Sequence, residues 1–227
     1  MANRYWVGGT GMWNSSNTTN WSASSGGAGG DSIPTSSDAA IFDASSGAGV
    51  CTIQSRNCLT LVCTGYTGTL TGEVNVFGTA ITLSSGGTYT GLGLIAAASC
   101  TFTSAGKTIA SIIVDTGTVT VTCADAMSAT SAEIKSAGTL LLKNGVTSTI
   151  NALTTTNQFS RNLRSTTGGS QATLSGSIGR NTLTYTTVQD IAFTGGAEWV
   201  AGTGIVVNSN VTGLKSYASG LFFGCPF

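Results

Sequence analysis

The chain has 227 residues, a length that suits a single domain of moderate size. Charged residues make up 8% of the chain, against about 25% in an average protein, and nine basic residues balance nine acidic ones. This composition excludes a disordered charged tail and a basic surface for nucleic acid. The chain has no histidine, which excludes every catalytic scheme and zinc site that needs an imidazole.

Residues 1–45 are predicted to form an N-terminal cap or attachment segment, and they hold three of the four tryptophans, Trp6, Trp13 and Trp21. These side chains could form a platform on which sugar rings stack, or an apolar lid over the first coil of the fold. We favour the lid, because a bulky and rigid ring covers much apolar surface at a low cost in entropy. A partner-binding role for the three tryptophans at this end of the molecule is kept as a further hypothesis.

Residues 46–190 consist of short runs in which apolar residues alternate with Thr or Ser, separated by turns rich in Gly and Asn. Such runs predict strands with one buried face. Their spacing of roughly 8–12 residues fits an antiparallel sandwich or barrel, or a β-solenoid with about three short strands per coil. The scarcity of charge favours the solenoid, since stacked like charges repel whereas stacked hydroxyls can hydrogen-bond. The predicted fold is therefore all-β, a parallel β-helix of about 20–25 residues per coil.

One stretch in this region, 125–133, has weak helical periodicity, and its Ser and Thr content favours irregular structure instead. Six cysteines are spread along the chain without a C-x-x-C pair: Cys51, Cys58, Cys63, Cys100, Cys123 and Cys225. The first residues lack the apolar segment of a secretory signal, which predicts synthesis in a reducing cytoplasm. We therefore interpret the cysteines as small buried hydrophobes rather than disulfide partners. No run of 18 apolar residues predicts a membrane span, so no membrane partner is expected.

Motifs of known chemistry are weak. The segment from Ser104 to Lys107 matches S-x-x-K, but the companion motifs of that enzyme class are missing. Two carboxyl groups about 5–9.5 Å apart could hydrolyse glycosides, and neighbouring coils could bring such a pair together. Asp38 and Asp43, which flank an apolar pair, are interpreted as turn-capping residues rather than calcium ligands or an acid–base pair. We predict that the protein is not an enzyme and uses no cofactor or metal.

Two further segments are candidate partner contacts. Arg161 and Arg164 form the one local basic cluster, which could meet an acidic surface, although a solvated loop is the default interpretation. Residues 191–227 are predicted as a C-terminal cap or tail, and three of its aromatic side chains are candidate contacts, Phe222, Phe223 and Phe227. Exposed, they would form an apolar patch, so we expect them to be buried against the solenoid end or a partner chain.

Several patches resemble a known family. They are 3–13, the Asn20-Trp21 pair, the Gly-rich run 25–30, the segment 34–44, and 188–199 with its Gly195-Gly196-Ala197 and Trp199. Together they resemble the β-helical structural proteins of bacteriophages, and the opening is also similar to β-strand repeats of autotransporter adhesins. The patches at the two ends are the more specific ones, whereas the low-complexity middle would match many solenoids.

The resemblance implies that the protein is a component of the virion and is made in the host cytoplasm. Its expected partners are further copies of the chain, in a homotrimer, and other virion proteins. Within that class we expect a capsid decoration or cement protein that binds the major capsid protein, because the chain is short and has no fibre shaft. The alternative is a tail fibre or appendage that binds host surface glycan through Tyr66, Tyr89, Tyr185 or Tyr217. A third possibility is a β-helical polysaccharide depolymerase.

Overall fold

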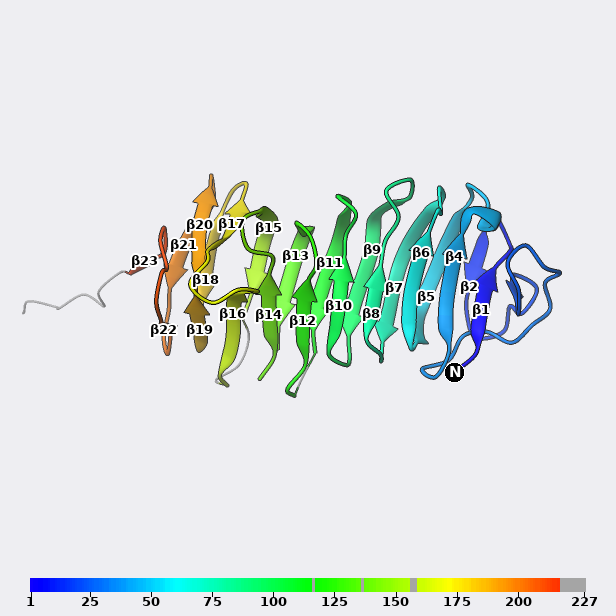
Figure 1. Ribbon diagram of the computed structural model, residues 1–227, viewed down its shortest axis with the longest axis horizontal. Coiled ribbons are helices and arrows are strands. Elements are labelled where there is room, and N and C mark those ends of the chain that lie inside the picture. Colours follow the sequence, from blue (N-terminus) through cyan, green and yellow to red (C-terminus); the bar gives the residue numbers. More distant parts are fainter. Residues whose placement is uncertain (116, 136, 156–158, 217–227) are drawn as a thin grey trace, which may run out of the picture.

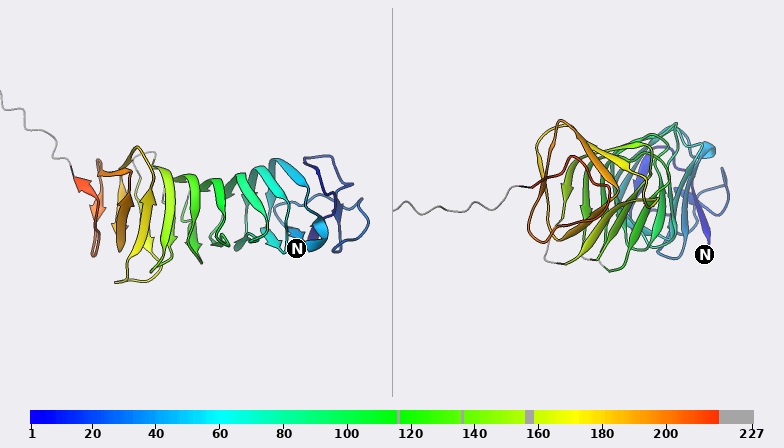
Figure 2. Two further views of the ribbon diagram at one scale, coloured as in Figure 1. Left: turned by 90° about the horizontal axis from the view of Figure 1, so that it is seen from above. Right: turned by 60° about the vertical axis from the view of Figure 1, so that its left-hand side comes forward.

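The computed structural model describes residues 1–115, 117–135, 137–155 and 159–216. The chain winds into a column of about eight turns whose two main walls are parallel β-sheets, so the predicted β-solenoid is confirmed (Figure 1). The two ends of the described chain lie at opposite ends of this column (Figures 1 and 2). No helix among the described residues is long and apolar enough to cross a membrane.

The first sheet has eleven strands, which in spatial order are β22 (Val206–Val207), β19 (Thr186–Gln189), β16 (Arg161–Ser165), β14 (Thr139–Leu142), β12 (Thr120–Cys123), β10 (Cys100–Thr103), β8 (Ala80–Thr82), β6 (Thr60–Thr64), β4 (Ala39–Asp43), β1 (Asn3–Trp6) and β3 (Trp21–Ser22). The second sheet has nine strands, β2 (Gly11–Trp13), β5 (Val50–Cys58), β7 (Thr69–Val76), β9 (Thr88–Ala96), β11 (Thr108–Val114), β13 (Ser128–Ile134), β15 (Thr147–Thr154), β17 (Ala172–Gly176) and β20 (Ile191–Gly195). A third sheet at the C-terminal end has three strands, β18 (Arg180–Leu183), β21 (Glu198–Ala201) and β23 (Lys215–Ser216). A 3-10 helix, η1 (Ala44–Ser46), follows β4.

Most coils therefore contribute two strands, not the three that we expected. The strands of the second sheet are longer than the apolar runs in the sequence suggest, because β5 and β7 continue through an irregularity in their pairing. Gly72 lies there with φ of 96°, a conformation that residues with a side chain rarely adopt. Because glycine can adopt it, the strand continues through this position. The interpretation of 125–133 as irregular was wrong, since β13 begins at Ser128 and pairs in parallel with β11.

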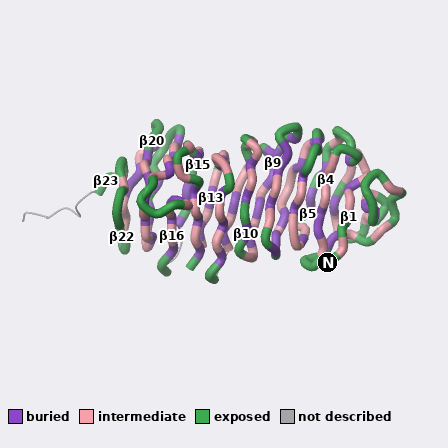
Figure 3. The backbone as a smooth tube through the Cα atoms, viewed as in Figure 1, coloured by how far each residue is buried: buried purple, intermediate pink, exposed green. Residues whose placement is uncertain are grey.

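Buried residues recur in every coil along the column (Figure 3), and apolar ladders of these residues form the core between the sheets. In the first sheet Leu61 lies opposite Ile81, Ile81 opposite Phe102, and Phe102 opposite Cys123, in steps of 20 or 21 residues. The steps lengthen to 23 residues from Leu140 to Leu163 and to 25 residues from Leu163 to Val188, and the second of these steps contains β18 of the third sheet. Polar ladders of Thr and Ser lie on the outside, and the hydroxyls of Thr108 and Ser128 are 2.9 Å apart across one of them.

The cysteines of the described chain are part of this interior. Cys51, Cys58, Cys63, Cys100 and Cys123 are all buried and free, which confirms that they serve as small hydrophobes; Cys225 lies outside the described residues. Burial raises the pKa of the Cys63 thiol to about 12 and that of the Cys100 thiol to about 11. These thiols are held in the protonated form, which does not react as a nucleophile.

We expect a Cys225→Ser variant to show no thiol that reacts with Ellman's reagent near pH 8 in the native state, and five that react after denaturation. The same thiols make the fold sensitive to alkali. Unfolded thiols lose their protons above the ordinary pKa of 9.0, whereas folded Cys100 keeps its proton up to about 11, so stability falls as the pH rises through this window. A thiol that reacts in the native state as fast as free cysteine would contradict the burial described here.

Candidate functional site: the two ends of the solenoid

The N-terminal end of the column is closed by an aromatic plug, which consists of Trp6, Trp13, Trp21 and Phe42. All four side chains are fully buried. The Trp21 ring meets the edges of Trp6 and Trp13 at centroid distances of 5.3 and 5.0 Å. β3 pairs antiparallel with β1 and ends the first sheet at this side. The lid interpretation of the tryptophans is therefore confirmed, and none of the three rings is at the surface to contact a partner.

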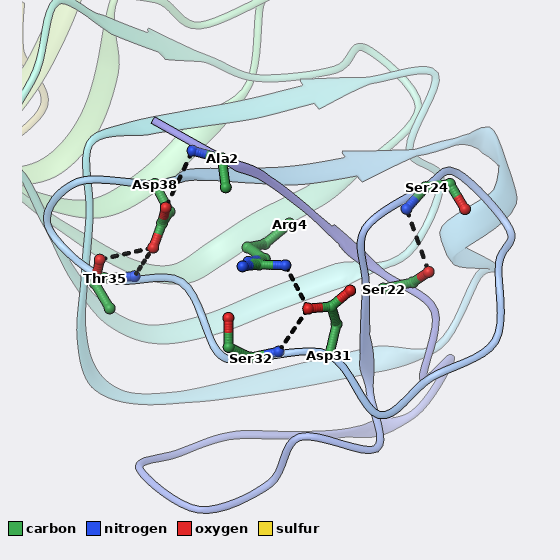
Figure 4. Close-up of polar contacts among 8 residues, drawn as sticks. All are labelled: Ala2, Arg4, Ser22, Ser24, Asp31, Ser32, Thr35 and Asp38. Atoms are coloured by element: carbon green, nitrogen blue, oxygen red, sulfur yellow. Dashed lines mark hydrogen bonds and ion pairs between the residues drawn. The ribbon is translucent and has the colours of Figure 1, made fainter.

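Polar contacts hold the N-terminal loop 22–38 against the first residues of the chain (Figure 4). The Asp38 carboxylate accepts hydrogen bonds from the Ala2 N–H at 3.1 Å and from the Thr35 N–H and hydroxyl at 3.2 and 2.7 Å. Burial alone would raise the pKa of Asp38, but these bonds and the charge of Arg4 outweigh it and hold the pKa below its ordinary value of 3.8. Arg4 forms an ion pair with Asp31, which also accepts from the Ser32 N–H. Asp38 is thus a turn-capping residue, as predicted.

Asp43 has the same kind of role at the start of η1. Its carboxylate accepts from the Ser45 N–H at 2.9 Å, and its own N–H donates to the Ser46 hydroxyl, which completes a capping box. The prediction that Asp43 caps a turn is confirmed.

The opposite, C-terminal end of the column holds a smaller aromatic pair, Phe193 and Trp199, whose ring centroids are 5.1 Å apart, and it leaves two apolar side chains of the last strand exposed. The interior ladder of Leu163 and Val188 ends on Val207 of β22, and the side chain of Val207 is 52% exposed. Its neighbour Val206 is exposed to the same extent. β22 is also the outermost strand of the first sheet (Figure 1). The last residues of the core and the edge of the first sheet are therefore exposed at the same place. The predicted contacts Phe222, Phe223 and Phe227 lie outside the described residues.

Both predicted end segments contribute strands to the column. Residues 1–45 contribute β1 and β4 to the first sheet and β2 to the second, so they form part of the column as well as its plug. Residues 191–216 contribute β20 to the second sheet, β22 to the first, and two strands to the third.

The basic pair Arg161 and Arg164 is not a solvated loop, because both residues belong to β16. Arg161 points inward and is fully buried, and its guanidinium donates to the Thr184 carbonyl at 3.1 Å. Burial lowers the pKa of Arg161, and the charge of Glu133 opposes this shift. Arg164 lies on the outer face, half-buried, and donates to the Asn162 side chain at 2.8 Å. The two charges are thus on opposite faces of one strand and do not form a joint basic patch.

Two of the tyrosines proposed for glycan stacking are also interior residues. Tyr66 and Tyr89 are buried, with the Tyr66 hydroxyl 3.2 Å from the Gly49 carbonyl and the Ser84 N–H donating to Tyr89. Neither ring can stack on a sugar at the surface. Tyr185 is half-buried, and Tyr217 lies outside the described residues.

Two glutamates on the outer face of the second sheet lie far apart. Glu73 lies on β7 and Glu133 on β13, three strand positions apart in the second sheet, which corresponds to about 14 Å. That separation exceeds the upper limit of about 9.5 Å for a glycosidase pair. Asp115 pairs with Lys135 at 3.1 Å, and Glu198 with Arg180 and Lys215 at 3.6 and 3.4 Å. The described residues contain no group of three or more His, Cys, Asp or Glu side chains that could hold a metal ion.

One shallow hollow of about 400 Å³ lies on the outer face of the first sheet between β8 and β12. Its lining is made mainly of hydroxyl side chains, Thr79, Ser99, Thr101, Thr120 and Thr122. Such a surface can donate and accept hydrogen bonds, but it offers no charged group and no aromatic ring.

Comparisons with protein-family models, with curated proteins and with solved structures find no match.

Proposed function

We propose that this protein is a non-enzymatic structural component of a bacteriophage virion, specifically a capsid decoration protein that docks through the C-terminal end of its solenoid. The observation that carries the proposal is the difference between the two ends. The N-terminal end is closed by the aromatic plug, whereas at the other end Val206 and Val207 of the outermost strand are 52% exposed.

An open strand edge is a template for pairing with another chain, and natural proteins usually cover or disrupt it. Strand addition would supply main-chain hydrogen bonds, and the exposed valines would supply apolar contact. Only 8% of the chain is charged, so such docking would depend little on salt. The column between the ends is a continuous hydrogen-bonded stack, which suits a protein that bridges neighbouring capsomers and opposes pressure from packaged DNA.

The partners in this proposal are the major capsid protein and further copies of the chain, as a homotrimer, and the location is the virion. A second candidate is an appendage that binds host glycan, which is favoured by the hydroxyl-lined hollow on the first sheet. The two candidates differ in how many copies each particle carries and where they lie.

The test uses particles assembled without this chain, to which the purified chain is added back. We expect hundreds of bound copies distributed over the head, located by electron microscopy and counted by quantitative mass spectrometry. A Val206→Asp, Val207→Asp variant should lose most of this binding, whereas a Val50→Asp variant should keep it. Val50 is a matched control, since it is 41% exposed and lies on β5, near the N-terminal end.

Binding confined to the tail at about a dozen copies would replace decoration by the appendage role. New reducing ends after incubation with capsule polysaccharide would show a depolymerase. Equal binding by the two aspartate variants would contradict docking through the C-terminal end.

A further inference from the structure

Three aspartates lie at the ends of strands of the first sheet, and two of them have evident structural roles. Asp43, at the end of β4, caps η1. Asp125 follows β12, and its two carboxylate oxygens accept from the Ser104 and Ala105 N–H groups of the preceding coil at 2.8 and 2.7 Å. Both carboxylate oxygens of Asp125 therefore accept a hydrogen bond from the backbone.

Asp190, directly after β19, is different. Its side chain is only 2% exposed, and its Oδ2 accepts from the Gly169 N–H at 3.1 Å. Its Oδ1 is buried and has no hydrogen-bond partner among the described residues. The backbone cannot easily turn this oxygen toward solvent, since the Asp190 N–H donates to Ser209 at 3.0 Å and its carbonyl accepts from Ala172 at 2.9 Å.

The chain supplies no positive charge for this carboxylate. All nine Lys and Arg residues lie within the described part of the chain, and none of them forms an ion pair or hydrogen bond with Asp190. The residues outside that part carry no basic side chain. A buried carboxylate that is neither paired nor fully hydrogen-bonded is strongly unfavourable, and proteins resolve this by pairing the charge or by coordinating a metal ion.

Other oxygen atoms lie at the same corner. Arg164 is opposite Gln189 in the ladder, which places the next residue, buried Ser165, in the position that corresponds to Asp190. The Ser165 hydroxyl accepts from the Thr167 N–H at 3.3 Å and retains a further lone pair. The Gly169 carbonyl accepts only a long bond of 3.4 Å from the Asn210 side chain. The turn 166–170 thus reaches the carboxylate through the Gly169 N–H and brings further oxygen atoms to the same corner.

We propose that Asp190 Oδ1 binds a hard monovalent cation, Na⁺, with the Ser165 hydroxyl, a carbonyl of the turn 166–170 and water as the remaining ligands. Oxygen donors of this kind are those that hard cations prefer. One carboxylate balances one positive charge, so a monovalent ion leaves the site neutral. The ion would connect the corner of the β16 coil to that of the β19 coil.

The test compares thermal unfolding in sodium chloride and in choline chloride at equal ionic strength. We expect the midpoint of thermal unfolding of the wild-type chain to be about 2–4 °C higher in sodium chloride, because a ligand that binds only the folded state stabilises it. Asp190→Asn should abolish this difference. Asp125→Asn is the matched control: it should lower the midpoint in both salts and keep the sodium response.

A second measurement does not depend on any variant. In crystals of the wild-type protein grown with Tl⁺ in place of Na⁺, we expect an anomalous peak in contact with Asp190 Oδ1. The proposal is overturned if the two salts give equal midpoints in the wild-type chain, or if the crystals show only water at Oδ1. It is also overturned if the Asp125→Asn and Asp190→Asn variants respond to sodium alike.

Discussion

We expect replacement of Trp21 by alanine to lower the free energy of unfolding by about 3–5 kcal/mol, the range for removing a large buried aromatic side chain. Trp21 is fully buried and contacts Trp6, Trp13 and Phe42 at centroid distances of 5.3, 5.0 and 5.8 Å. The cavity would lie at the centre of the aromatic plug, so the surrounding rings cannot all collapse into it. Urea unfolding followed by circular dichroism measures the change.

The matched control is Met12→Ala. Met12 lies next to Trp13 in β2 but is 40% exposed, so its loss should cost less than about 0.5 kcal/mol. Because a solenoid can unfold in parts, hydrogen exchange of the β4 and β6 amides should accompany the unfolding curve. A Trp21 variant as stable as the Met12 variant would mean that the plug does not hold the end of the column.

The second large effect is expected when one whole coil of the column is removed. Deletion of residues 82–102, one coil, should leave a folded protein that is shorter by one strand spacing of about 4.8 Å. Ile81 and Phe102 occupy equivalent positions in the first sheet, so the cut joins Ile81 to Thr103, which takes the place of Thr82. In the second sheet β7 would then pair with β11, and Val74 would meet Ile112 in place of Leu94. Circular dichroism and small-angle scattering report the strand content and the length.

Deletion of residues 82–92, half a coil, is the control with the opposite expected outcome. It joins β8 of the first sheet to the second half of β9 without the connecting turn. The chain could no longer cross from one sheet to the other, and every later strand would lie opposite the wrong partner. We expect loss of the folded state; a folded product from the half-coil deletion, or an unfolded one from the full-coil deletion, would contradict the repeat described here.

The sequence was sufficient to predict the solenoid and its coil length, because alternation of apolar and hydroxyl residues depends only on the two-residue period of a strand. It was not sufficient for the number of strands per coil. Gly72 and the neighbouring polar residues look like a turn, yet they lie inside β7, where pairing with β5 and β9 overrides the local preference.

The candidate site was predicted less well. Alternation across Arg161, Leu163 and Ser165 already places all three on one face, but the charge of Arg161 argued for the outside, and burial of an arginine depends on distant acceptors such as Thr184. The buried carboxylate of Asp190 gave no signal at all, because its environment is made by turns from two other coils.

The position of the aromatic plug has a consequence for biosynthesis. Its residues precede the later coils in the chain, and each main-sheet strand after them pairs with a strand of a coil already made. Folding can therefore follow translation, with the tryptophan cluster as the seed and each new coil templated by the last. The last strand to be added to the first sheet is then β22, at the end of the column opposite the aromatic plug.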